Sequence, residues 1–145
     1  IRGLGGLRGL RKLDLQSNRL TLVEGLEALE ALEELYLGHN AIETLHPGVF
    51  ASLTSLHTLD LSSNRLSALL PAHLEGLRAL KDLWLSANAI ASFDDVIPAL
   101  QEATPELQTL YLEHNPLARA FDYRIRLARR IPTLTQIDAT AVPRE

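Results

Sequence analysis

The residues best suited to molecular recognition recur at one position of a repeated pattern. In each complete copy of the pattern a single residue lies between two leucines, and these residues are Asp14, Tyr36, Asp60, Trp84 and Tyr111. They include the only tryptophan of the chain and two of its three tyrosines. Exposed aromatic rings give a protein interface much of its binding energy, and carboxylates orient a basic partner. This column therefore indicates binding of another protein.

The positions two residues before and two residues after this column are also polar. The leucine alternation predicts that all three columns lie on one face of a sheet, because neighbouring strand residues point to opposite sides. Strand propensity alone would also favour Tyr and Trp, but three aromatics in one short column favour a binding face. The predicted partner-binding residues are Asp14, Glu34, Tyr36, Asp60, Asp82, Trp84, Tyr111 and Glu113.

Catalysis and metal binding have little support. The chain has no cysteine and contains no nucleophile elbow, phosphate loop or HExxH motif. Asp60 and Asp82, on neighbouring predicted strands, could hold a cation or exchange protons, but an open sheet would not exclude water from them. His39 and His114 are separated by three repeats. We expect no enzyme activity, no cofactor and no metal site.

The pattern that positions these residues is L-x-x-L-x-L-x-x-N-x-I at residues 80–90. It recurs at residues 10–20, 32–42, 56–66 and 107–117, and a degenerate sixth copy covers residues 134–142. This is the leucine-rich-repeat signature. It predicts an α/β solenoid, a right-handed superhelix with a parallel concave sheet. The asparagines of the motif are predicted to bond backbone groups of adjacent turns; they are Asn18, Asn40, Asn64, Asn88 and Asn115.

The segments between signatures differ in length and pattern. Val23, Leu26 and Leu29 predict a short convex helix or 3₁₀ turn, whereas residues 45–53 predict irregular turns. A longer helix is predicted through residues 96–100, capped by Ser92 or Asp94 and ending near Thr104.

The last segment predicts a helical cap over the end of the solenoid. Its apolar and aromatic residues have helical spacing up to Pro132, and Leu134 and Ile137 then predict a final half-strand. Tyr123 is predicted to pack inside this cap. The spacing that indicates the helix is that of Phe121, Tyr123, Arg124, Ile125, Leu127, Ala128 and Ile131. We divide the chain into repeats at 1–117 and a cap at 118–145, and interpret the arginines of the cap as a solvated face.

The composition narrows the choice of compartment and partner. The net charge is −4 and hydrophobic residues make up 46% of the chain, so nucleic acid is an unfavourable partner. The absence of cysteine favours a reducing, intracellular location in the cytoplasm or nucleus rather than secretion. No run is long enough for a membrane helix. Residues 1–10 align with residues 23–32, so we expect the chain to begin within a repeat of a longer array.

Several segments resemble one family closely. These are residues 110–117 (LYLEHNPL), 122–124 (DYR), 136–140 (QIDAT), 13–21 (LDLQSNRLT) and 34–40 (ELYLGHN). They are similar to the leucine-rich regulatory subunit of type-one protein phosphatase, the Sds-twenty-two type. The cap frame alone is shared with a spliceosomal and several ciliary proteins. The 24-residue units near residues 47–50 and 70–71 depart from the family's regular length.

The resemblance implies a non-catalytic regulatory or targeting subunit. Its concave face would dock the phosphatase catalytic subunit through acidic and aromatic residues, which match Asp60, Asp82, Trp84 and Tyr111 here. Asp82 stands where the family tends to carry glutamate. A structural adaptor of a ciliary or other cytoskeletal assembly is the alternative function, and neither alternative requires a nucleic acid, membrane or small-molecule partner.

Overall fold

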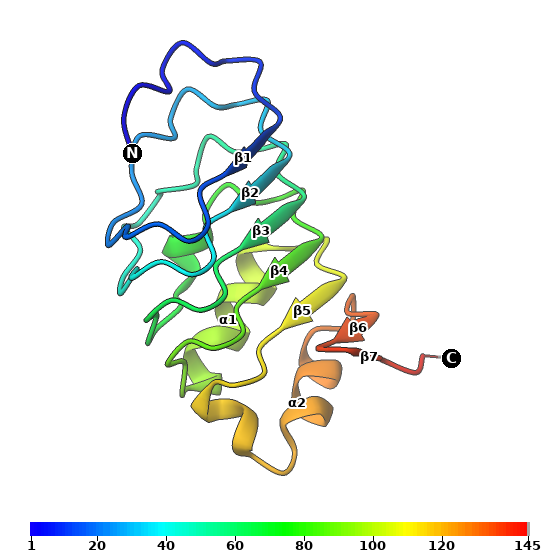
Figure 1. Cartoon of the computed structure of the whole chain (residues 1–145). Helices are drawn as coiled ribbons and strands as arrows, with labels where there is room; N and C mark the ends of the chain where they lie inside the picture. Colours follow the sequence, from blue (N-terminus) through cyan, green and yellow to red (C-terminus); the bar gives the residue numbers. More distant parts are fainter. Residues whose placement is uncertain (145) are drawn as a thin grey trace.

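The protein forms one curved sheet with the chain wound around it as a solenoid (Figure 1). The structure, a computed structural model, describes residues 1–144. The strands follow each other in sequence order; the first six pair in parallel and the last pairs antiparallel with its neighbour. They are β1 (Lys12–Asp14), β2 (Glu34–Tyr36), β3 (Thr58–Asp60), β4 (Asp82–Trp84), β5 (Thr109–Tyr111), β6 (Gln136–Ile137) and β7 (Thr140–Ala141). The predicted solenoid with a parallel sheet is confirmed.

The core is a strip of leucines that lies behind the sheet. In each central repeat the leucines of the signature are fully buried, as Leu59, Leu61 and Leu83 are. Each repeat is too small to enclose a core, so its leucines pack against those of the repeats before and after it. The side chains that alternate with these leucines consequently point to the opposite face of the sheet.

The motif asparagines stabilise the turns that leave the strands. Asn64 Nδ2 donates to the carbonyl oxygens of Leu37 and Leu61, both at 3.0 Å, and its Oδ1 accepts from the Ile42 N–H at 3.1 Å. Asn40, Asn88 and Asn115 repeat this arrangement. Backbone groups that would otherwise be buried unpaired are thereby satisfied. The predicted structural role is confirmed for these four asparagines, whereas Asn18 bonds only its own turn.

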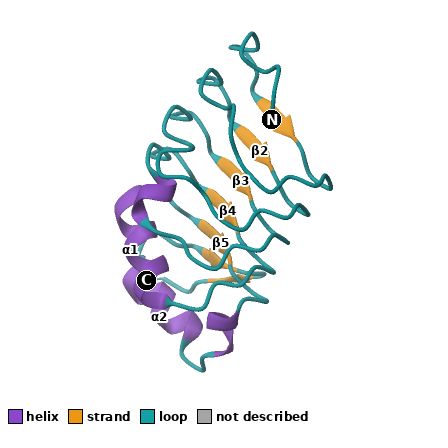
Figure 2. Ribbon diagram, turned by 90° about the vertical axis from the view of Figure 1, so that its left-hand side faces the viewer, coloured by secondary structure: helices purple, strands orange, loops and turns teal. Residues whose placement is uncertain are grey.

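The convex side is irregular near the N-terminus and helical near the C-terminus (Figure 2). The 3₁₀ helix η1 (Pro71–Leu74) packs against α1 (Phe93–Ala103), the helix predicted in the longest unit. Ser92 precedes α1, but its side chain makes no capping hydrogen bond. Around Leu26 the second of the two predicted alternatives, a turn with 3₁₀-type bonding, forms instead of a helix: the Leu29 N–H donates to the Leu26 carbonyl three residues earlier at 3.1 Å.

The C-terminal cap contains a short helix and a hairpin. Following the 3₁₀ helix η2 (Pro116–Arg119), α2 (Tyr123–Arg130) buries Tyr123 and Leu127. The cap helix forms as predicted, but two of the apolar residues whose spacing indicated it do not pack into the core. Phe121 precedes the helix and is fully exposed, and Ile125 is 56% exposed. Helical spacing includes residues on both faces of so short a helix, so it does not separate core from surface. The antiparallel strand β7 was not predicted.

Candidate protein-binding face

The sheet register aligns the predicted binding residues in rows. Tyr36 pairs with Asp60, Asp60 with Trp84, and Trp84 with Tyr111 across neighbouring strands. Asp14 precedes Tyr36 in the same row. Glu34, Thr58 and Asp82 form the row beside it. The face that carries these rows is called the concave face below. It comprises the outward-pointing residues of β1 to β5 together with the residue two positions after the end of each strand.

Three aromatic rings form one connected cluster on the concave face. The ring centroids of Trp84 and Tyr111, on adjacent strands, are 6.4 Å apart in an edge-to-face arrangement. The rings of Trp84 and Tyr36 are 5.9 Å apart although β3 lies between their strands. Neighbouring strands are separated by about 4.8 Å, so two strands should place these residues about 10 Å apart. The rings therefore lean toward each other, and all three remain partly exposed.

Asp60 lies between the two rings and differs from the expectation of an open side chain. It is 7% exposed. Its Oδ1 accepts hydrogen bonds from the backbone N–H of Ser62 at 2.9 Å and from the Ser62 hydroxyl at 2.6 Å. The absence of a side chain at Gly38 makes room for the Asp60 carboxylate, since a Cβ at position 38 would lie 3.0 Å from Asp60 Oδ2. The register correctly places Asp60 in the row, but its longer neighbours lean over it.

Tyr36 is held by charged neighbours on its own strand and on β1. Its hydroxyl donates to Glu34 Oε1 at 2.5 Å, and Lys12 Nζ lies 5.4 Å from the ring centroid. The hydrogen bond to Glu34, partial burial, and the negative charges of Glu34, Asp60 and Asp14 raise the pKa of Tyr36 to about 12. This end of the face therefore carries a negative field that disfavours any further negative charge.

The remaining predicted residues are more open. Asp82 and Glu113 are half-buried and Asp14 is exposed. The Thr58 hydroxyl lies 3.5 Å from Asp82 Oδ2, which makes at most a weak hydrogen bond. The hydroxyl of Tyr111 accepts a hydrogen bond from Gln136 Nε2 at 2.8 Å, which orients the ring from the cap side. All eight predicted residues thus belong to one face, with Asp60 covered and the others reachable.

Two serines complete this face and were not predicted as binding residues. Ser62 and Ser86, together with Trp84 and Tyr111, line an open hollow of about 350 Å³. The serines lie two residues after the central row, so their small side chains leave the aromatic rings accessible from one side. Their place in the repeat could have identified them, because a small residue beside a large ring creates a hollow.

The histidines do not form a cluster. Within residues 1–144, no group of three or more His, Cys, Asp or Glu side chains could hold a metal ion. Burial lowers the pKa of His73, whose Nδ1 accepts the Leu70 N–H at 3.0 Å in a turn of the convex side. In the same part of the chain, no helix has the length and apolar character needed to span a membrane.

Comparison with solved structures agrees with this architecture. A chain of the Drosophila melanogaster SNF/U2A′ complex superposes with a TM-score of 0.80 at 26% identity, covering 92% of this chain and 75% of that chain. A leucine-rich-repeat protein of Leptospira interrogans superposes with a TM-score of 0.74 at 28% identity, covering 93% of this chain and 32% of that one.

Comparison with curated proteins gives shorter matches. Rat leucine-rich repeat and fibronectin type-III domain-containing protein 4 is 48% identical over 67 residues, which are 45% of this chain and 10% of the relative. Human Toll-like receptor 5 is 54% identical over 43 residues, which are 27% of this chain and 5% of the receptor. This chain therefore spans about a tenth or less of the length of these relatives.

The family comparison covers most of the solenoid. The family described as "Leucine rich repeat" matches residues 30–90 and 54–117, and the family described as "Leucine Rich repeats (2 copies)" matches residues 8–50. The matched segments contain all five complete signatures and the rows of the concave face. The chain belongs to the leucine-rich-repeat family.

Proposed function

We propose that this chain is a non-catalytic protein-binding module and that its concave face binds a basic surface of a type-one Ser/Thr protein phosphatase catalytic subunit. The observation that carries the general part is the cluster of Tyr36, Trp84 and Tyr111 on a sheet edged by carboxylates. Such rings bury large areas at little entropy cost, and the acids favour cationic partners. Regulation or targeting of the phosphatase inside the cell is the corresponding role.

The choice of phosphatase rests on sequence resemblance. The segments 110–117, 122–124 and 136–140 resemble the regulatory subunit described above, and its binding positions correspond to Asp60, Asp82, Trp84 and Tyr111. The burial of Asp60 modifies its proposed part: it would hold Ser62 and raise the local negative potential instead of contacting the partner. Trp84, Tyr111 and Asp82 would make the direct contacts.

The decisive experiment measures the affinity of the purified catalytic subunit for this chain by calorimetric titration. Trp84→Ala should weaken the complex by about 2 kcal/mol or more, which is the effect of removing a central aromatic anchor. Phe121→Ala is a matched control, because Phe121 is a fully exposed aromatic side chain outside the concave face. Its removal should leave the affinity unchanged, and both variants should unfold near the wild-type temperature.

Two results would contradict the proposal at different levels. If the catalytic subunit does not bind the wild-type chain, the phosphatase assignment is wrong. If it binds but Trp84→Ala has the same affinity as wild type, the partner is right and the concave face is the wrong surface.

A further inference from the structure

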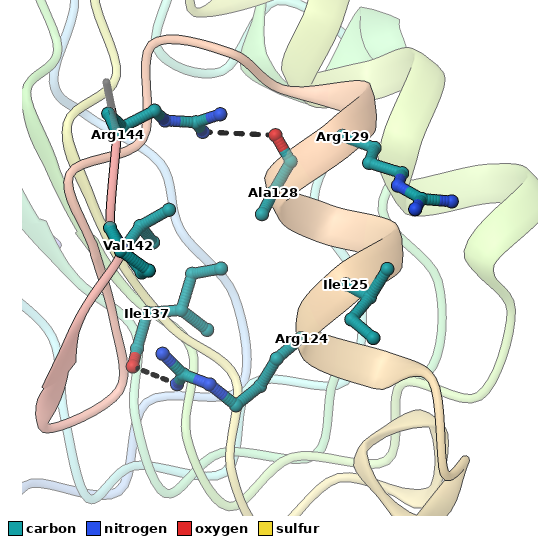
Figure 3. Close-up of a pocket in the computed structure, with 8 residues that line it drawn as sticks. Arg124, Ile125, Ala128, Arg129, Ile137, Val142 and Arg144 are labelled. Carbon is teal, nitrogen blue, oxygen red and sulfur yellow. Dashed lines mark hydrogen bonds between the residues drawn. The ribbon is translucent and has the colours of Figure 1, made fainter.

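A second surface lies at the C-terminal cap, between helix α2 and the strands β6 and β7 (Figure 3). It is a groove of about 370 Å³. Its apolar side chains are Ile125 and Ala128 from the helix and Ile137, Val142 and Pro143 from the opposite side. Ile125 is 56% exposed, so the apolar part of the groove is open to solvent. We call this surface the cap groove.

Three arginines line the cap groove. Arg124 Nη1 donates to the Ile137 carbonyl at 2.6 Å, and Arg144 Nη2 donates to the Ala128 carbonyl at 3.0 Å, so both guanidinium groups connect the helix to the opposite wall. Arg129 is exposed and extends from the helix (Figure 3). The groove has arginines on both walls and no acidic residue among its lining residues.

Within residues 1–144, no arginine of the cap groove forms an ion pair. The ion pairs of this part of the chain join Ile1 to Glu24, Arg65 to Glu43 and Arg126 to Asp122. None of them includes an arginine of the cap groove. Backbone carbonyls accept hydrogen bonds but carry no net charge, and each guanidinium has five N–H donors. The arginines therefore keep both charge and unused donors for an anionic ligand.

We propose that the cap groove binds an acidic peptide segment of a partner protein, with one or two apolar side chains on Ile125 and Val142 and flanking carboxylates on the arginines. Charge complementarity selects the occupant: an apolar floor between cationic walls fits an amphipathic anion, and arginine forks match carboxylates. The groove volume suits a few side chains. This inference does not depend on the concave face, whose charge is of the opposite sign.

The test uses a labelled peptide with the sequence Glu-Glu-Leu-Phe-Glu-Glu and fluorescence anisotropy at low salt. Arg129→Glu should weaken binding about fivefold or more, because an attractive charge becomes repulsive. Arg130→Glu is the matched control: it makes the same charge change on the next residue, which lines a different cavity together with Phe93 and Asp94. Arg129 and Arg130 are both exposed, so neither substitution should unfold the cap.

The apolar floor is tested separately with Ile125→Ser, which should weaken peptide binding about fivefold. Leu70→Ser is its control, since Leu70 is 41% exposed and lies on the convex side near η1. For a peptide in which lysine replaces each glutamate, neither Arg129→Glu nor Ile125→Ser should weaken the binding measured, because the cationic cap groove is not its site. Raising the salt concentration should also weaken binding of the acidic peptide to the wild-type chain, because salt screens its attraction to the arginines.

Several results would overturn the inference. One is that the acidic peptide does not bind the wild-type chain. Another is that Arg129→Glu and Arg130→Glu weaken peptide binding equally, which would indicate only general electrostatic attraction. Binding of dodecanoate or of vesicles rich in phosphatidylserine that requires Arg129, without peptide binding, would assign the groove to a lipid instead. None of these outcomes bears on the phosphatase proposal, whose test uses the concave face.

Discussion

Asn18 and Asn64 occupy the same position of the repeat, but their surroundings differ. Asn64 is 8% exposed and bonds backbone groups of its own repeat and the preceding one. Asn18 is exposed and bonds only the carbonyl oxygens of Leu15 and Gln16, at 2.8 and 3.2 Å, within its own turn. The motif residue thus gains most of its structural role from the neighbouring repeat.

The cap has Val142 at this motif position instead of an asparagine, and a carboxylate elsewhere in the cap bonds the preceding repeat. Asp138 Oδ1 accepts the N–H groups of Leu112 and Glu113 at 2.8 and 3.0 Å, and Oδ2 accepts the Tyr123 hydroxyl at 3.0 Å.

One repeat earlier, the Leu85 N–H donates to the Tyr111 carbonyl of the next strand at 2.8 Å. Asp138 follows Ile137 as Tyr111 follows Leu110, and its side-chain oxygen accepts the Leu112 N–H in place of such a backbone carbonyl. The last full repeat therefore bonds a side chain where the inner repeats bond the next strand.

The largest effect is expected for Asn64→Ala compared with Asn18→Ala. Removing the Asn64 amide leaves the Ile42 N–H and several buried carbonyls without their partner, which should lower the free energy of unfolding by about 3 to 4 kcal/mol. The same change at Asn18 should cost about 0.5 kcal/mol, because water can replace its bonds. Urea unfolding of both variants measures the difference. Equal losses would show that the neighbouring repeat adds nothing.

A smaller effect is expected for Asp138→Ala, about 2 to 3 kcal/mol, because two backbone N–H groups and the Tyr123 hydroxyl lose their acceptor. The backbone adds to the loss, since Asp138 has φ of 54° and alanine disfavours this left-handed conformation. Asp138→Asn keeps one acceptor oxygen and tolerates the conformation, so it should lose about half as much. If Asp138→Ala unfolds like wild type, the carboxylate does not replace the backbone acceptor that the inner repeats receive from the next strand.

The smallest effect concerns two tyrosine–carboxylate pairs, Tyr36 with Glu34 on the open face and Tyr123 with Asp138 in the cap. In both, hydrogen bonding and burial raise the tyrosine pKa in the folded state. A raised pKa stabilises the fold below pH 10, and this contribution is lost as the pH rises from 10 through the folded value, about 12 for Tyr36.

Tyr36→Phe should therefore lose less stability than wild type between pH 10 and pH 12, while differing little from it at pH 7. Urea unfolding at several pH values across this window measures the difference. Tyr123→Phe is the comparison, since its pair is buried and it should be destabilised at pH 7 as well, by about 1 kcal/mol. If the free energy of unfolding has the same pH dependence in wild type and Tyr36→Phe, the hydrogen bond to Glu34 does not stabilise the folded state.

Much of the fold follows from the repeat pattern because the pattern is redundant. Leu59, Leu83 and Leu110 occupy equivalent positions, so one alignment predicts the burial of all three and the outward direction of their neighbours. The register of the concave rows follows from the same alignment. The asparagine ladder could be predicted because an amide is the group that both donates to carbonyls and accepts from N–H groups.

The details that were not predicted are of two kinds. Some depend on the conformations of neighbouring side chains, and others belong to the cap, which occurs only once in the chain. Asp60 points to the predicted face, but its burial depends on how far the larger Tyr36 and Trp84 extend over it. The cap occurs once, so no second copy separates the exposed Phe121 and Ile125 from the buried Tyr123. The predicted final half-strand forms as β6, but β7 and the hairpin that joins the two strands were missed because a two-residue strand leaves no periodic pattern.

The approach of Tyr36 to Trp84 across β3 makes the character of the face depend on how tightly the solenoid is bent. Flattening the array would move the two rings apart and expose the carboxylate of Asp60 to water. The centre of the face would then be a charged group instead of a pair of touching aromatic rings. A partner that straightens or tightens the superhelix would therefore alter the chemistry it touches. Trp84 is the only tryptophan, so a change in its fluorescence would report a change in the curvature of the solenoid.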